Sequence, residues 1–199
     1  IKRPAFTAAA LITLALGITA NTTIFTFVNA FLLKPFPFPN DHELVAIGRF
    51  NAGNSSELGS LSFPDFDDIR GKTQSLQNVA AYSWSNFNLA GSDRPIWSGG
   101  AKVSADFFQT LDVHPLVGRT FTQEDDAPGA TPTMLLSESL WNDHFGRAQD
   151  IVGSNVMVDG ITRTVIGIIP KGHELPMKAR LWVPLGLRRD ESTRNQTWL

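Results

Sequence analysis

Residues 4–33 read PAFTAAALITLALGITANTTIFTFVNAFLL, and none of them is Asp, Glu, Lys, Arg or His. As a helix this run would rise about 45 Å at 1.5 Å per residue, which exceeds the roughly 30 Å hydrocarbon core of a bilayer. Lys2 and Arg3 stand immediately before it, and basic residues mark the cytoplasmic side of a membrane helix. The run therefore predicts a transmembrane helix with a cytoplasmic N-terminus and a C-terminal end that extends beyond the membrane.

Two other interpretations of this run stay open. A cleaved signal peptide has an apolar core of about 7–15 residues followed by a small-residue cleavage site. Ala20 would be the last residue before such a cleavage, but Ile18 fits the site poorly and the apolar pattern continues to Leu33. The second interpretation is a buried helix of a soluble protein, in which an uncharged run of this length is unusual. We favour the membrane anchor.

Small or compact polar side chains recur at every fourth position of the run. Lipid gives helices no hydrophobic drive to associate, so small side chains that allow close approach favour helix contacts. The alternative is that Ala and Thr are simply common in such segments. The helix-packing residues that we predict are Ala9, Thr13, Gly17 and Asn21.

The rest of the chain is mildly acidic and has no cysteine. Two of the 17 Lys and Arg residues precede the run, whereas all 19 Asp and Glu residues follow it, so residues 34–199 carry a net charge of about −4. This charge argues against a nucleic-acid partner, because proteins that bind nucleic acid present a basic face to the phosphates. The lack of cysteine excludes disulfides, thiolate metal sites and cysteine nucleophiles.

Beyond the run, three alternating prolines in Lys34–Pro39 end the helix and favour an extended exit from the membrane. Alternating apolar positions between turn residues then predict short strands, and serines at N-cap positions predict short helices. The predicted strands are 44–50, 82–89, 95–103, 132–136, 155–158, 161–169 and 181–184. The predicted helices are 63–72 with Ser62 as cap, 105–111 with Ser104 as cap, and 138–145 between Ser137 and Gly146. Asp159-Gly160 is a strong two-residue hairpin signal.

These elements predict an α+β fold, with one long N-terminal transmembrane helix followed by a mixed α+β periplasmic domain of short strands and helices. We expect three parts: a transmembrane helix that extends into the periplasm (1–33), a proline-rich connector (34–43) and the periplasmic domain (44–199). The chain begins with Ile and ends abruptly at Leu199. We therefore expect an N-terminal fragment whose domain is incomplete at its C-terminus.

No pattern of a catalytic or metal site stands out. The sequence has no Gly-x-Ser-x-Gly elbow and no P-loop. The four histidines have no metal-binding spacing; they are His42, His114, His144 and His173. We predict no catalytic residue, no cofactor and no metal.

Two groups of carboxylates could have a chemical role: the first could act as general acids and bases or hold a cation, and the second could hold a divalent ion. They are Asp65, Asp67 and Asp68, and Glu124, Asp125 and Asp126. Acids in the first turn of a helix also favour the macrodipole and the open N–H groups there. We favour a structural role for both groups, with a weak divalent-ion site as the alternative for the second.

A series of short motifs runs through the chain in order. In the apolar run they are Phe6-Thr7, Leu14–Ile18, Ala20–Thr22, Ile24-Phe25, Val28–Ala30 and Leu32–Pro35. In the domain they are Ser62–Phe66, Val103–Phe108, Gly118–Phe121, Leu136-Ser137, Leu140-Trp141, Phe145-Gly146, Ile151–Gly153, Val165–Pro170 and Leu181–Pro184. Together they resemble FtsX-like ABC transporter permeases, most closely the acidobacterial-type orphan permeases with a MacB-like periplasmic core domain. One departure is Thr19, where a second glycine is usual.

The resemblance implies that residues 44–199 form a MacB-like periplasmic core domain of a non-catalytic permease subunit in the bacterial inner membrane. It also implies a homodimer or permease dimer, with ATP hydrolysis by a separate cytoplasmic ABC ATPase whose motion the first helix relays outward. One rival is a single-pass membrane-anchored binding or sensor domain outside the cytoplasm. The other is a secreted enzyme whose signal is Ile1–Ala20.

Overall fold

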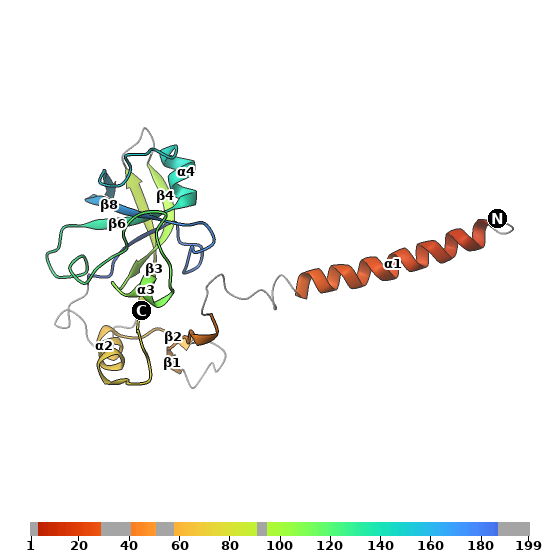
Figure 1. The fold of residues 1–199 in the computed structure, drawn as a ribbon, viewed down its shortest axis with the longest axis horizontal. Helices are drawn as coiled ribbons and strands as arrows, with labels where there is room; N and C mark the ends of the chain where they lie inside the picture. Colours follow the sequence, from red (N-terminus) through yellow and green to blue (C-terminus); the bar gives the residue numbers. More distant parts are fainter. Residues whose placement is uncertain (1–3, 29–40, 51–57, 91–94, 187–199) are drawn as a thin grey trace. The chain divides into compact units, whose positions relative to one another are not determined.

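The computed structural model describes residues 4–28, 41–50, 58–90 and 95–186 (Figure 1). The chain divides into two compact units, residues 1–36 and residues 37–199. Most of the predicted proline-rich connector lies outside the described residues, as does the end of the predicted membrane helix after Val28. Within the connector, Asp41–Glu43 form one turn of 3-10 helix, η2.

The first unit contains the single helix α1, Pro4–Val28. Its hydroxyl side chains bond to the helix backbone one turn earlier: Thr13 Oγ1 donates to the carbonyl of Ala9 (3.0 Å), and Thr22 Oγ1 to that of Ile18 (2.8 Å). Each of these hydroxyls is therefore hydrogen-bonded within its own helix. Polar groups in hydrocarbon need such internal partners, because no water is available there. By length and composition, Pro4–Phe27 can cross a membrane, with a mean hydropathy of 1.7, and none of this span is buried.

The second unit is built on a seven-stranded mixed sheet with the order β5-β8-β6-β9-β4-β3-β7. β4 and β9 are parallel, as are β6 and β8, and the other neighbours are antiparallel. β7 pairs with β3 on one side and with β8 on the other, so the sheet curls back on itself. The strands are β3 (Tyr82–Ala90), β4 (Ile96–Val103), β5 (Val117–Gly118), β6 (Thr133–Ser137), β7 (Asn155–Val158), β8 (Ile161–Ile169) and β9 (Leu181–Pro184).

The predicted hairpin is confirmed as β7–β8. Asp159 and Gly160 both adopt positive φ, 51° and 77°, as a type I′ turn requires. The turn also fastens the hairpin to β3, because the N–H of Asn88 donates to Asp159 Oδ1 and the N–H of Asp159 donates to the carbonyl of Asn88, both at 2.9 Å. One local turn thereby closes the curled sheet.

Two of the predicted helix caps are confirmed. Ser62 begins α2 (Phe63–Lys72), where its Oγ accepts the N–H of Asp65 at 3.3 Å. Ser137 begins α4 (Glu138–Phe145), where its Oγ accepts the N–H of Leu140 at 3.1 Å. Gly146 ends α4 in the left-handed conformation, with φ 58°.

Two other predictions need correction. The helix predicted at 105–111 is shorter, α3 (Phe107–Thr110), and Ser104 does not cap it, because its buried Oγ accepts the N–H of Ala81 at 3.0 Å instead. The strand predicted at 44–50 is reduced to β1 (Arg49–Phe50), paired with β2 (Leu58–Gly59). Val45 and Ile47 are exposed, so the alternation of apolar residues there does not mark a strand face that packs on the core.

Neighbouring residues of the strands enter different hydrophobic clusters, as expected for a sheet with two covered faces. Leu181 belongs to the cluster that includes Leu140 of α4, whereas Trp182 belongs to the cluster that includes Phe108 of α3. Phe108 packs edge-on against Trp182, with 5.4 Å between ring centroids. Both faces of the sheet are thus part of the core.

Candidate functional site

The predicted helix-packing residues all lie on α1, in the first unit. Ala9, Thr13, Gly17 and Asn21 are exposed and follow one another at intervals of four residues, so they share one side of the helix. A Cβ added at Gly17 would have no neighbour within 4 Å. Helix packing by these four residues stays a prediction.

The first carboxylate group lies on α2, and two of its members serve the helix itself. Asp65 Oδ2 accepts the hydroxyl of Ser62 at 2.7 Å, which links this carboxylate to the helix cap. Asp68 pairs with Lys72 one turn later, with 3.2 Å between Oδ1 and Nζ. The structural role that we favoured for Asp65 and Asp68 accounts for these contacts.

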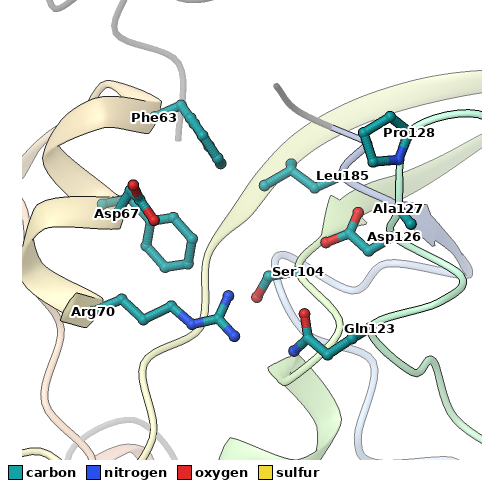
Figure 2. Close-up of a pocket in the computed structure, with 10 residues that line it drawn as sticks. Phe63, Asp67, Arg70, Ser104, Gln123, Asp126, Ala127, Pro128 and Leu185 are labelled. Atoms are coloured by element: carbon teal, nitrogen blue, oxygen red, sulfur yellow. The ribbon is translucent and has the colours of Figure 1, made fainter. Parts of the chain in front are cut away.

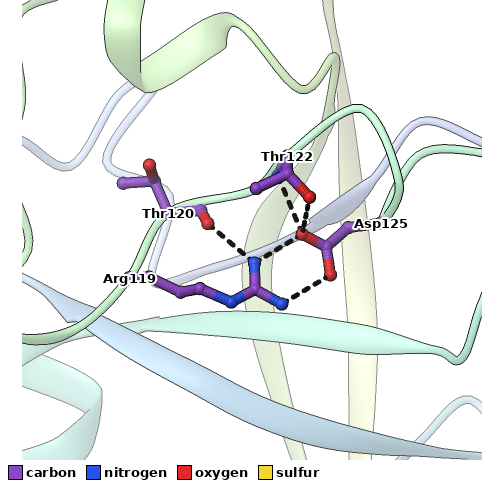
Figure 3. A network of polar contacts seen from close by, with 4 residues as sticks. All are labelled: Arg119, Thr120, Thr122 and Asp125. Atoms are coloured by element: carbon purple, nitrogen blue, oxygen red, sulfur yellow. Dashed lines mark hydrogen bonds and ion pairs between the residues drawn. The ribbon is translucent and has the colours of Figure 1, made fainter.

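The second group lies in the loop before β6, and Asp125 is its best-connected member (Figure 3). Arg119 binds it with both terminal nitrogens, at 2.5 Å to Oδ2 and 2.9 Å to Oδ1. Oδ2 also accepts the N–H (2.8 Å) and the hydroxyl (2.9 Å) of Thr122. These donors, Arg119 foremost, lower the pKa of Asp125 from 3.8 to about 2, and Asp125 in turn raises the pKa of Arg119. The hydrogen bonds of this carboxylate therefore stabilise the loop, which is a structural role and not a ligand-binding one.

Asp126, the next residue, fastens three segments together. Its Oδ1 accepts the N–H of Gly186, just beyond β9, at 2.6 Å, and the carboxylate also accepts the N–H of Ala105, just before α3. Burial raises the pKa of Asp126, while the charge of Arg70 on α2 opposes that rise.

Members of the two carboxylate groups meet at one hollow of about 230 Å³ (Figure 2). Asp67 and Arg70 line it from α2, and Asp126 and Gln123 line it from the opposite loop. Phe63, Phe66, Leu185, Ala127 and Pro128 form its apolar walls, and Ser104 also lines it. No spacing or motif indicated that the two groups would face each other.

Asp106, beside this hollow, makes two contacts that the sequence analysis did not predict. Arg70 Nη2 lies 3.0 Å from Asp106 Oδ2, and Gln123 Nε2 donates to Asp106 Oδ1 at 2.8 Å. Asp106 therefore links α2 to the loop before β6. The contacts connect residues far apart in sequence, and no spacing rule announces them.

The arrangement offers charge pairing between elements, and its residues do not combine into a metal centre. Among residues 4–28, 41–50, 58–90 and 95–186, no group of three or more His, Asp or Glu side chains is placed to hold a metal ion. Three of the four histidines have different neighbours: His42 is near Glu43 (3.8 Å), His114 is near Asp112 (3.9 Å), and His144 stacks edge-on against Phe145.

Comparison with known proteins points to one family. The profile of the family described as MacB-like periplasmic core domain matches residues 7–198, nearly the whole chain. Comparison with curated protein sequences finds no significant match.

Two solved structures share the fold. The periplasmic region of MacB from Actinobacillus actinomycetemcomitans is 17% identical, with a TM-score of 0.55 over 74% of this chain and 69% of that one. The extracellular domain of the noncanonic ABC-type transporter YknZ from Gram-positive bacteria is 16% identical, with a TM-score of 0.52 over 70% of this chain and 71% of that one. At such identities the likeness concerns the fold alone, and it agrees with the predicted α+β class.

Proposed function

The chain belongs to the family of MacB-like periplasmic core domains of ABC-type transporter permeases, and from this premise we propose that it is the permease subunit of an ABC-type exporter or mechanotransmission complex. In this role it relays the motion of a cytoplasmic ATPase to a periplasmic domain. The chain contributes no catalysis of its own, and ATP hydrolysis belongs to a separate subunit. We further propose the boundaries 1–33, 34–43 and 44–199 for membrane helix, connector and core domain.

One observation supports this proposal above all: a helix that can cross a membrane precedes a domain with the fold of extracytoplasmic transporter domains. Every described side chain of α1 up to Phe27 is exposed. In water so much apolar surface would be unfavourable, at roughly 25 cal/mol per Å². A lipid environment removes that penalty, and Lys2 and Arg3 favour a cytoplasmic N-terminus.

The relay requires a rod that keeps its shape when it is pulled or turned. α1 is a continuous helix of 25 residues without an internal proline, and its threonines satisfy their own hydroxyls. We propose that two such helices pack through Ala9, Thr13, Gly17 and Asn21 in a homodimer or permease dimer. Gly17 would be the point of closest approach, because it has no side chain.

A topology experiment tests the anchor. Alkaline phosphatase fused after Leu199 should be active in bacterial cells, and green fluorescent protein at the same place should stay dark. The fusion should remain in membranes after an alkaline carbonate wash. As a control, Leu14→Arg with Leu16→Arg should reduce membrane retention, since arginine at the centre of a span costs about 2.5–3.5 kcal/mol. A wild-type protein that is washed off, or whose N-terminus is Asn21, would overturn the anchor.

A purification experiment tests the relay separately. The protein isolated from its host in mild detergent should carry ATPase activity that vanadate inhibits, and Leu14→Arg with Leu16→Arg should lose it together with the membrane. Membrane retention without any associated ATP hydrolysis would contradict the relay. That result would favour the rival function, a single-pass binding or sensor domain.

A further inference from the structure

α2 is attached to the rest of the domain through a small interface of its own. Phe66 is the one residue of α2 that is buried, and it packs with Ala81 and Leu185 in a cluster separate from the two clusters of the main sheet. Phe63 lies partly buried against the same cluster. A helix held by one buried side chain loses little apolar burial when it moves, so such elements belong to the less stable parts of a fold.

The segment after α2 has the properties of a joint. Residues 73–81 belong to no helix or strand, and β3 begins only at Tyr82. The chain is fixed again at Ala81, where the N–H donates to Ser104 Oγ at 3.0 Å and the carbonyl accepts the N–H of Ser104 at 2.9 Å. Irregular backbone between two fixed points is where hinge rotations are absorbed.

Beneath α2 the interface is polar and incompletely filled. Figure 2 shows Arg70 and Asp126 pointing into the hollow of about 230 Å³ from opposite sides. Arg70 is bonded to Asp106, 3.0 Å away, while its charge also acts on Asp126. Among the described residues Asp126 has backbone N–H partners and no basic side chain bonded to it. Arg70 therefore has two carboxylates within electrostatic reach and occupies one of them.

We propose that α2 is a hinged clamp, which closes into the hollow of Figure 2 when Arg70 exchanges Asp106 for Asp126. In the open state, described here, Arg70 is paired with Asp106 and not with Asp126. In the closed state Arg70 reaches Asp126, the hollow collapses, and Phe66 stays in its cluster as the pivot. The clamp goes beyond the proposed function, because it is a property of the periplasmic domain whether or not an ATPase drives it.

Distance measurements between two spin labels test the clamp. Because the chain has no cysteine, Lys72→Cys on α2 and Thr131→Cys in the loop before β6 label two exposed positions of the full chain in detergent micelles. The distance distribution, recorded by pulsed electron resonance in frozen samples, should contain two populations. Asp106→Asn removes the open partner and should increase the short-distance population. Asp126→Asn removes the closed partner and should decrease it.

Each substitution should change the ratio of the two populations by about two- to fivefold, the range expected for a partly exposed ion pair. Asp112→Asn is the matched control, because Asp112 is exposed, lies beside α3 and has no part in the hollow; it should leave the ratio unchanged. Near-ultraviolet circular dichroism confirms that each labelled variant is folded. A single distance that none of the substitutions alters would overturn the clamp, as would shifts of the same sign for Asp106→Asn and Asp126→Asn. Either failure leaves the membrane anchor untouched.

Discussion

Replacing Asp125 by Asn should destabilise the domain measurably. The carboxylate accepts two bonds from Arg119 and two from Thr122. Asparagine keeps one acceptor oxygen and turns an NH₂ group toward donors. The change from a pKa of 3.8 to about 2 corresponds to roughly 2 kcal/mol. Because the side chain of Arg119 is 52% exposed, solvent screening reduces this to about 1–2 kcal/mol.

The pH dependence has a definite sign. The pKa of Asp125 is lower in the folded protein than in the unfolded chain, so its contribution is complete above about pH 4 and is lost as the pH falls toward 2. The wild-type protein should lose stability in that window. Asp125→Asn has nothing to protonate there, so the difference between the two proteins should shrink as the pH falls.

Tryptophan fluorescence is the suitable assay, because all five tryptophans lie after residue 83, outside α1. At pH 7 the variant should melt about 2–8 °C below the wild type, given roughly 2–4 °C per kcal/mol for a domain of this size. Asp143→Asn is the control: Asp143 pairs with Arg180 at 2.6 Å, but its side chain is 68% exposed, so its loss should change the melting temperature by less than about 1 °C. Equal melting temperatures of wild type and Asp125→Asn at pH 7 would refute this reasoning.

Three further substitutions have clear expected outcomes. Gly17→Leu should weaken dimerisation of the full chain in micelles by about 1 kcal/mol or more, because a large side chain prevents close helix approach; unchanged chemical crosslinking would contradict the packing residues. Gly100→Ala should prevent stable folding, since its Cβ would collide with the carbonyl of Leu181 on the neighbouring strand. Gly71→Ala, in open space on α2, should instead stabilise the domain by about 0.5–1 kcal/mol. Thermal melts of the two variants test both expectations. Ser62→Ala should cost about 1 kcal/mol in a urea titration through the lost cap of α2, and an unchanged midpoint would argue that the cap is irrelevant.

Local signals in the sequence were reliable where neighbouring residues satisfy one another. Asp159-Gly160 has positive φ at both positions, and Ser62 and Ser137 bond to N–H groups three residues ahead. Such features depend on interactions among a few consecutive residues, so contacts with distant parts of the chain did not change them. The same holds for the alternating strands on either side of the hairpin.

Prediction failed where the outcome depended on distant partners. Val45 and Ile47 alternate like strand residues, but no strand among the described residues covers them. Ser104 stands at the position of a helix cap in the sequence, but its hydroxyl accepts the N–H of Ala81 instead.

The hollow is the clearest case of a site that sequence reasoning could not assemble. Arg70 and Asp106 are 36 positions apart, and their pairing follows from how α2 docks. Spacing rules predicted the helix that carries Asp65, Asp67 and Asp68, although only Asp65 lies in its first turn, and Glu124, Asp125 and Asp126 lie in a loop and not at a helix start. They contain no information on which segments face each other after folding.

The curled sheet has a consequence for how the domain behaves before and after it folds. β7 pairs with the last two residues of β3, Leu89 and Ala90, and with the first four residues of β8, so these parts of both strands present no open backbone to another extended chain. The outermost strand, β5, is two residues long and ends at Gly118, whose φ of 81° departs from extended geometry. At these positions a foreign strand finds no free backbone groups to pair with. The closure should therefore limit edge-to-edge pairing between copies of the domain at the hairpin end of the sheet.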